Sequence, residues 1–428
     1  MTRSAALVAI NCTCCGAGLD VLGGGRVEVH ICPYCGSTLN AQDNYKLLGQ
    51  HDRKRQTTTP IEIGMRCHLH GVDYTVIGLI EQYERWAGQS ALWVDFQLYS
   101  PTHGYVWLTL ENDHLTLSRR VRTSRMLTPA EVERAPAQPR LKFRGMWFKY
   151  YETSTSEAIY VAGEFSYRPQ IADRVTTVTV VAARAALHFS RTGQEDEVEI
   201  STYVTPAEAN DAFGTDLGLR PSGVHPEQPL RKGPNHDFLR RLWLCGAGLC
   251  LLLALLLSGG RGSTVLNTTY AVNDLPVEVP FAIATANQLV EIELSGPVNN
   301  SWADFDMEVT GPEDDPLFGI GRGIEYYTGS DKDGRWSEGN RTARVRFRPE
   351  TPGTHALFLD LSEAGNWPAT TPGTPIREVS LTVREGLTSG SWALRSGLFF
   401  VALFALMIAR QVLHHARRWQ GCDWTDED

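Results

Sequence analysis

Two long apolar segments constrain this chain of 428 residues more than any other feature. Residues 242–258 read LWLCGAGLCLLLALLLS and contain no charged side chain. At ~1.5 Å rise per residue, such a segment with its apolar neighbours is long enough to cross the hydrocarbon core of a bilayer. Residues 392–413 are also apolar, and Arg395 lies close enough to one end for its side chain to reach the headgroups. We predict transmembrane helices over residues 239–260 and 392–413.

Basic residues flank these two segments mainly on one side, and only Arg261 closely follows the first segment. Arg240 and Arg241 precede the first segment, and Arg410, Arg417 and Arg418 lie at the end of the second. Because positive loops stay in the cytoplasm, this pattern predicts that both termini are cytoplasmic and that residues 262–390 lie outside. The predicted location is a bacterial inner membrane, as a multi-pass protein with a cytoplasmic tail over residues 414–428.

Four cysteines near the N-terminus have the spacing of a metal site. Cys12 and Cys15 form one C-x-x-C pair, and Cys32 and Cys35 form a second. Each pair is followed by a glycine, which permits the tight turn that brings two thiolates together. Four thiolates around Zn²⁺ form a closed, structural site. A domain this small has too small a core to fold without such a metal cross-link. We predict a zinc ribbon over residues 1–50, although Cys14 remains an alternative to Cys12.

The cysteine and charge distributions separate the two sides of the predicted membrane. Six of the nine cysteines precede residue 70, and residues 251–421 contain none, which does not fit a disulfide-stapled domain. Residues 262–390 carry 9 Lys or Arg against 19 Asp or Glu, in a chain of net charge −9. No nucleic-acid partner is expected from this acidic balance.

Short alternating segments dominate the rest of the chain. Residues 60–213 contain closely spaced strand patterns separated by turn signals, which predicts an antiparallel β domain on the cytoplasmic side. Residues 214–237 are rich in Pro, Gly and Asn and are predicted to be a flexible linker. Seven or eight strand patterns within residues 262–390 predict an extracytoplasmic β-sandwich. The predicted fold class is therefore mainly β.

Ordered motifs of the middle region resemble a known family. They are Gly64, Tyr74-Thr-Val-Ile-Gly78, Trp93, Trp107-Leu108 with His114, Gly163-Glu164-Phe165, Val198-Glu199-Ile200 with Tyr203, and Ala212-Phe213. In this order, over residues 60–213, they resemble the bacterial family called domain of unknown function 4178. The resemblance implies an inner-face module of membrane proteins that is often associated with polyamine synthesis or membrane stress. It implies no catalytic activity.

Direct evidence for catalysis is weak. His68 and His70 alternate on a predicted strand and could share one face, and Glu164 could be a buried acid. Trp93, Trp107 and Trp147 are interpreted as core residues. The sequence contains no GxSxG, P-loop or HExxH motif, so no catalytic residue is assigned and the chain is predicted not to be an enzyme.

The leading hypothesis is a non-enzymatic membrane protein that links a cytoplasmic zinc-ribbon and β interaction module to an outer β-sandwich. Protein partners are expected on both faces, in a system associated with membrane stress or polyamines. One alternative is an enzyme or enzyme subunit of polyamine or lipid metabolism. The other is a structural envelope scaffold.

Overall fold

The computed structural model describes residues 8–24, 26–51, 58–86, 88–192, 195–260, 262–368 and 375–424. The chain is mainly β, as predicted, and it divides into two compact units. The first comprises Met1–Lys232 with Ile408–Asp428, and the second is Gly233–Met407. Each unit is described by itself.

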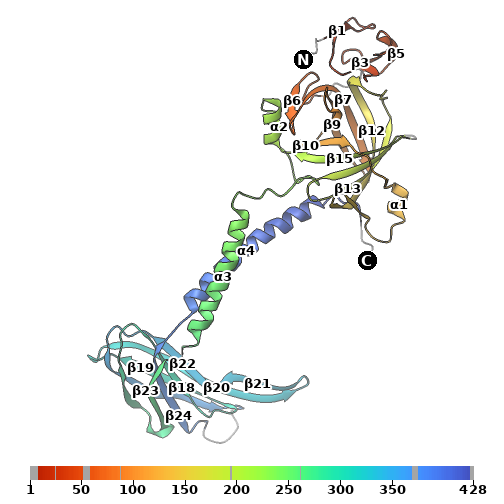
Figure 1. The fold of residues 1–428 in the computed structure, drawn as a ribbon. Coiled ribbons are helices and arrows are strands. Elements are labelled where there is room, and N and C mark those ends of the chain that lie inside the picture. Colours follow the sequence, from red (N-terminus) through yellow and green to blue (C-terminus); the bar gives the residue numbers. More distant parts are fainter. Residues whose placement is uncertain are drawn as a thin grey trace. The chain divides into compact units, whose positions relative to one another are not determined.

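The first unit is built around a closed antiparallel barrel (Figure 1). Each strand pairs with the next along the path β7, β8, β9, β10, β15, β14, β13 and β12, and β12 pairs with β7 to close the ring. The strands are β7 (Val72–Trp86), β8 (Gln89–Ser100), β9 (Gly104–Glu111), β10 (His114–Arg120), β12 (Met146–Phe165), β13 (Arg174–Val181), β14 (Ala186–Thr192) and β15 (Glu195–Val204).

The closure depends on two glycines where β12 crosses β7. Gly163 pairs with Gly78 and has a φ of +95°. A Cβ on Gly163 would lie 2.3 Å from the carbonyl oxygen of Ile77, and one on Gly78 would lie 2.8 Å from that of Glu164. Only residues without a side chain allow two backbones to approach this closely.

Apolar clusters cover the outside of the barrel. One includes Val94, Phe96 and Leu98 of β8, together with β6 (Arg66–Leu69) and α2 (Pro206–Phe213). The other lies under α1 (Pro129–Glu133) and β11 (Arg140–Phe143). Helix α2 begins at a capping box and ends before a left-handed glycine, Gly214.

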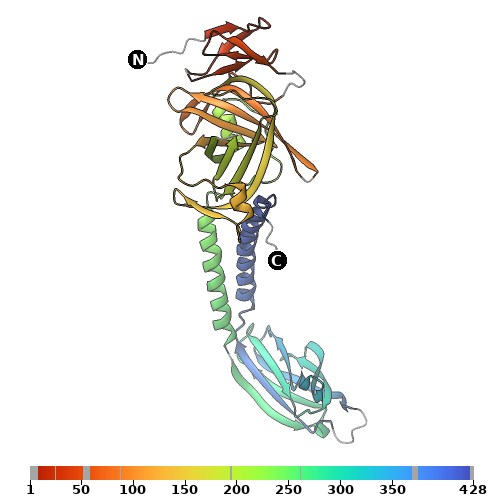
Figure 2. The same cartoon turned by 90° about the vertical axis from the view of Figure 1, so that its right-hand side faces the viewer.

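The strands of the N-terminal segment lie beside one end of the barrel (Figure 2), and three of them continue its sheet. Strands β3 (Val29–Ile31), β4 (Ser37–Asn40) and β5 (Lys46–Gln50) add to the edge of β12, because β3 pairs with residues 163–165. Strands β1 (Val8–Asn11) and β2 (Gly18–Val21) form a hairpin of their own.

Two segments that were predicted as a flexible linker and as a cytoplasmic tail pack on the barrel. Residues 214–235 contain no helix or strand, but Leu217 and Glu227 are buried. Near the C-terminus, Asp423 accepts hydrogen bonds at 2.9 Å from the Tyr150 hydroxyl and from the backbone N–H of Thr153. Both segments are therefore parts of the first unit.

The second unit contains a two-sheet β-sandwich, as predicted. One sheet has the order β16-β24-β18-β22, the other has β17-β23-β19-β20-β21, and one apolar cluster joins them. Strands β16 and β21 were not anticipated. The strands are β16 (Ser263–Ala271), β17 (Val277–Ile283), β18 (Leu289–Ser295), β19 (Ser301–Thr310), β20 (Pro316–Asp331), β21 (Gly334–Asn340), β22 (Thr342–Phe347), β23 (Gly353–Asn366) and β24 (Glu378–Leu387), with the short helix η1 (Val272–Asp274).

The two apolar segments form helices α3 (His236–Ser258) and α4 (Ser391–Arg418), and both are long and apolar enough to cross a membrane. Helix α4 is longer than expected, because it continues through the basic residues that were assigned to a tail. Within the second unit the helices approach closely at glycines. A Cβ on Gly246 would lie 3.2 Å from the ring of Phe400, and one on Gly390 would lie 2.3 Å from the carbonyl oxygen of Ala254.

Candidate functional site

The four cysteines of the N-terminal segment occupy two equivalent turns. The backbone N–H of Gly16 donates to the carbonyl of Cys12, and that of Gly36 donates to Cys32, both at 2.9 Å. These glycines have φ values of +74° and +72°. Such a left-handed residue turns the chain back after each pair, so both cysteines of a pair present their sulfur atoms on the same side.

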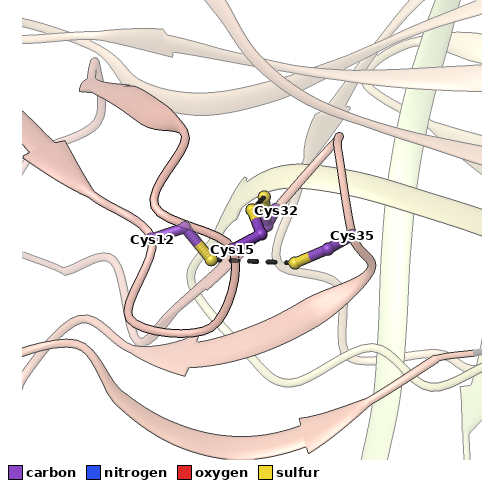
Figure 3. A group of neighbouring side chains, drawn as sticks. All are labelled: Cys12, Cys15, Cys32 and Cys35. Atoms are coloured by element: carbon purple, nitrogen blue, oxygen red, sulfur yellow. Dashed lines mark hydrogen bonds between the residues drawn. The ribbon is translucent and has the colours of Figure 1, made fainter.

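The two turns bring the four sulfur atoms together (Figure 3). The Sγ atoms of Cys12 and Cys35 are 3.7 Å apart, those of Cys15 and Cys32 are 3.8 Å apart, and all four lie within 4.8 Å of one another. A tetrahedral ion with bonds of about 2.3 Å places its sulfur ligands about 3.8 Å apart. The cluster can therefore hold a metal ion. Cys14 is exposed and lies outside the group.

Glu164 joins the cysteine-bearing segment to the barrel. Its side chain is 1% exposed, and its carboxylate accepts hydrogen bonds from the backbone N–H groups of Leu22 and Gly23. His30 lies 3.4 Å away. Glu164 is thus a buried acid, as the sequence suggested, and its oxygens are engaged by backbone donors.

The paired histidines do not converge. His68 contacts Asp73 at 2.7 Å, whereas His70 has left the strand, with a φ of 50°, and accepts from Arg119 at 3.0 Å. The expectation that they share one strand face is therefore wrong, because β6 ends at Leu69. Trp147 is also not a core residue, since its side chain is 65% exposed.

The barrel interior is a polar cavity that was not predicted. Its volume is about 1430 Å³, and residues from all eight strands of the ring line it, so it lies inside the barrel. Asp95, Gln97 and Tyr99 of β8 point into it, while Val94 and the other alternate residues of that strand belong to the outer apolar cluster. Exposed residues of the N-terminal segment, including Arg26, Glu28 and Gln42, line one end, so the cavity reaches solvent there.

The cavity is rich in carboxyl groups. Burial raises the pKa of Asp95 to about 6 and that of Glu199, on β15, to about 7. Burial, together with the nearby Glu111 and Glu84, raises the pKa of Glu152 on β12 to about 8. Directly paired residues of neighbouring strands lie on the same face of a sheet. Glu152 pairs with Thr179, Thr179 with His188, and His188 with Glu199, so Glu152 faces the cavity as Glu199 does.

Polar atoms in this interior lack protein partners. Gln97 is 3% exposed, and its Oε1 atom has no hydrogen-bond partner among the residues that the structure describes. Within the same described part of the chain, Gln82 Oε1 and the Tyr105 hydroxyl are also without one. All three side chains line the cavity. Unpaired buried polar atoms are rare in folded proteins and call for an explanation.

A buried chain of polar groups lies on the luminal face. His188 Nε2 contacts the Ser201 hydroxyl at 2.7 Å, and Ser201 donates to Glu227 at 2.6 Å. Burial opposes ionisation of Glu227, but His188 and Ser201 hold the pKa of this carboxyl below its usual range. Ser201 is no nucleophile in this arrangement, because it is fully buried and its proton is directed at a carboxylate.

The C-terminal end of α4 is anchored beside this chain of groups. Arg418 is 8% exposed, and it donates to the carbonyl oxygens of Pro226 and Ala182, both at 2.7 Å. Trp419 packs against the ring of Tyr151. The last turn of α4 is therefore fixed to the barrel wall and to the segment that carries Glu227.

Sequence reasoning found the cysteines and Glu164 but missed the cavity. The signal was present in β8 and β9, where polar and apolar residues alternate. Such alternation normally indicates one buried and one solvated face. It does not reveal that the polar face is enclosed by a barrel.

Comparison with known proteins gives one informative match. No curated protein matches the chain. Solved structures similar to it include an exo-beta-1,3-galactanase from Phanerochaete chrysosporium with galactose, at 7% identity, a TM-score of 0.15, and coverage of 88% of this chain and 100% of that one. The structure of infectious bursal disease virus Gt strain gives 8% identity, a TM-score of 0.12, and coverage of 86% and 75%. These TM-scores carry no argument about fold or function.

The family comparison agrees with the resemblance of the ordered motifs. Residues 62–206 match the family model described as Domain of unknown function (DUF4178). This range contains the eight strands of the barrel, together with Glu164 and the luminal acids. The chain therefore carries a DUF4178 domain, and the closed barrel is its structural core.

Proposed function

We propose that this chain is a non-enzymatic integral membrane protein of a bacterial inner membrane. The barrel and its cysteine-bearing extension form a cytoplasmic interaction module, and the β-sandwich is an interaction domain on the other side. Helices α3 and α4 cross the membrane between them. Protein partners bind on both faces, in a membrane-stress or polyamine-associated system.

The surfaces of the two helices support the membrane assignment. Leu255 and Leu256 of α3 are 73% and 63% exposed, and Phe399 and Leu406 of α4 are 62% and 67% exposed. Helices that are apolar on their outer faces and covered by no other part of the described chain are suited to lipid. The basic residues at the N-terminal side of α3 and the C-terminal end of α4 favour cytoplasmic termini.

The anchoring of α4 is the observation that carries the proposal. Helix α4 ends at Arg418, which is buried within the first unit against Ala182 and Pro226. A helix fixed in this way is suited to transmit movement along its axis. A simple lipid anchor would not need a buried, hydrogen-bonded arginine at its end.

Reporter fusions test the topology. A phosphatase active only outside the cytoplasm is inserted at Asn300, and a fluorescent protein that folds only inside is fused after Asp428. We expect activity from both fusions. Reports of the same compartment from the two positions would overturn the proposal.

The ion proposed for the cysteine cluster is structural Zn²⁺. Four cysteine ligands leave no open position for a substrate, and the sulfur spacing fits a tetrahedral ion. Metal analysis of the purified full-length protein should find about one zinc per chain. A ratio well below one, after purification under reducing conditions without chelator, would contradict this assignment.

The two rival functions have specific tests. Activity of an enzyme that uses Glu164 would be lost in Glu164→Gln with folding and partner binding unchanged, but backbone donors already occupy this carboxylate. The outer domain is required if the protein is a structural envelope scaffold, and it is also required if the protein signals across the membrane. Full function after deletion of residues 262–390 would therefore contradict both of these roles.

A further inference from the structure

The lumen of the barrel has the properties of a ligand site. Its volume of about 1430 Å³ exceeds the ~300–1,000 Å³ typical of small-molecule pockets, so a ligand and several waters fit together. We propose that this lumen binds a small organic cation whose ammonium or guanidinium groups contact Asp95 and Glu199 and donate a hydrogen bond to Gln97.

The charges of the lumen favour a cation. Asp95 and Glu199 line the cavity on β8 and β15, and of the two arginines that line it, Arg120 is already paired with Glu197 at 3.0 Å. Burial raises the pKa of both luminal acids even though Thr109 donates to Asp95 at 2.6 Å and His188 acts to lower the pKa of both, so part of the compensation for their ionised forms is missing. A bound cation would supply this compensation.

The unpaired atoms of the lumen specify a hydrogen-bond donor. Gln97 Oε1 and Gln82 Oε1 are amide carbonyl oxygens, which can only accept. Both lie on strands next to each other in the ring, and both line the cavity together with Asp95. Ammonium and guanidinium groups carry several N–H donors and no acceptor, so they satisfy carboxylates and amide oxygens at once.

The arrangement of the acids favours an organic cation over a metal ion. Asp95 is on β8 and Glu199 on β15, and these strands are separated in the ring by β9 and β10. With neighbouring strands about 4.8 Å apart, the backbones of these two residues lie on separate parts of the barrel wall. Within the described residues, only the four cysteines lie close enough together to form a metal-binding group. A ligand with cationic groups separated along a carbon chain can contact acids that lie on separate strands.

Isothermal titration of the full-length protein in detergent tests the proposal. The probes are 1,4-diaminobutane for ammonium and 4-guanidinobutylamine for guanidinium, with neutral butane-1,4-diol and CaCl₂ as comparisons. We expect saturable binding of at least one of the two amines, and the stronger of them identifies the preferred group. No saturable binding of either amine, or equal binding of the diol, would overturn the proposal. Calcium binding that displaces the amines would also overturn it.

Matched variants assign the site. The double substitution Asp95→Asn with Glu199→Gln should weaken amine binding at least tenfold, whereas Asp73→Asn, at an exposed position of β7 that does not line the cavity, should change it less than twofold. Gln97→Leu should weaken binding several-fold. Wild-type affinity in the double variant would exclude the lumen as the site.

A measurement on the unaltered protein keeps the proposal falsifiable if a variant fails to fold. Because a cation favours ionised carboxylates, amine binding near pH 7 should release protons from groups such as Glu199. The titration heat should then depend on the ionisation enthalpy of the buffer. Binding with no proton exchange at pH 6, 7 and 8 would contradict contact with the luminal acids.

Discussion

The strands of the barrel and of the sandwich both alternate apolar and polar residues, but the sandwich encloses the apolar face and the barrel encloses the polar face. In β19 of the sandwich, Phe305 and Met307 face the core, while Asp304 and Asp306 are exposed. In β8 of the barrel, the apolar residues face outward under covering segments, and Asp95 and its alternate neighbours face inward. The comparison teaches that alternation defines two faces but not which of them is enclosed.

The two interiors also differ in what they tolerate. The sandwich core is joined by buried apolar residues of both sheets, and such interiors are packed to the density of crystals. The barrel interior keeps space, carboxyl groups and unpaired amide oxygens. A packed apolar interior such as that of the sandwich stabilises the fold. An interior that keeps space and unpaired polar groups stabilises the fold less, but it leaves room for a ligand.

The largest expected effect concerns the cysteine cluster, which has too few buried apolar residues to replace a metal. Cys32→Ser should remove zinc and the ordered structure of residues 8–50, because structural zinc contributes about 10–16 kcal/mol of apparent folding free energy in small domains. Hydrogen exchange should show loss of protection there and none in the sandwich. The control is Cys14→Ser, which leaves the cluster intact and should retain zinc. Equal zinc content in Cys32→Ser would refute the assignment.

A buried charge in the sandwich should have the next largest effect. Phe305 is fully buried, so Phe305→Asp places an unpaired carboxylate in an apolar core and should cost more than about 4 kcal/mol. Urea unfolding followed by hydrogen exchange in strands β17–β24 measures this loss. Asp306→Asn, one residue away on the exposed face, should change stability by less than about 0.5 kcal/mol. Similar values for the two variants would break the distinction between the interiors.

Removal of the α4 anchor should have an intermediate effect. Arg418→Met retains the length of the side chain but loses its hydrogen bonds to Ala182 and Pro226, which should cost about 1–3 kcal/mol in the first unit. Urea unfolding of this unit, followed through the fluorescence of its half-buried Trp93 and Trp107, gives the value. Arg417→Met is the matched control, since Arg417 is exposed on the same turn. Indistinguishable stabilities would mean that the anchor contributes nothing.

The smallest effect depends on pH and sharpens the contrast between the interiors. The pKa of Glu152 is about 8 in the folded protein and about 4.3 in an unfolded chain, so its ionisation favours unfolding as the pH rises between these values. Glu152→Gln should therefore match the wild type at pH 4 and have a higher Tm than the wild type at pH 8. Thermal scans at both values measure this difference. A variant that is less stable at pH 8 would show that the Glu152 carboxylate is stabilising.

Several features were predictable because they depend on local chemistry. The spacing Cys12-x-x-Cys15 and Cys32-x-x-Cys35, each followed by a glycine, specified the turns and the cluster. Both apolar helices and the two-sheet sandwich were anticipated from uniform apolarity and from alternating strands. The bounds of α4 were not, because the basic residues at its end are helix-compatible and are held by the barrel.

Long-range contacts decided what could not be predicted. The pairing of His68 with Asp73, and of His70 with Arg119, follows from a turn after β6 and from a neighbouring strand. Residues 214–235 look like a linker in composition, yet Glu227 is buried because Ser201 and His188 of the barrel provide its partners. Composition records which residues are polar, and it contains no information on whether distant strands will enclose them.

The sequence by itself determined that this chain has two membrane-length apolar segments, a four-cysteine cluster and two regions of alternating strands. Only the tertiary structure decided that one of these regions closes into a ring. The closure depends on Gly78 and Gly163, which let β12 cross β7 at close range, and it turns the polar face of the sheet inward. The physical reason is that alternation is a local property of each strand, whereas inside and outside exist only after the first and last strands have paired.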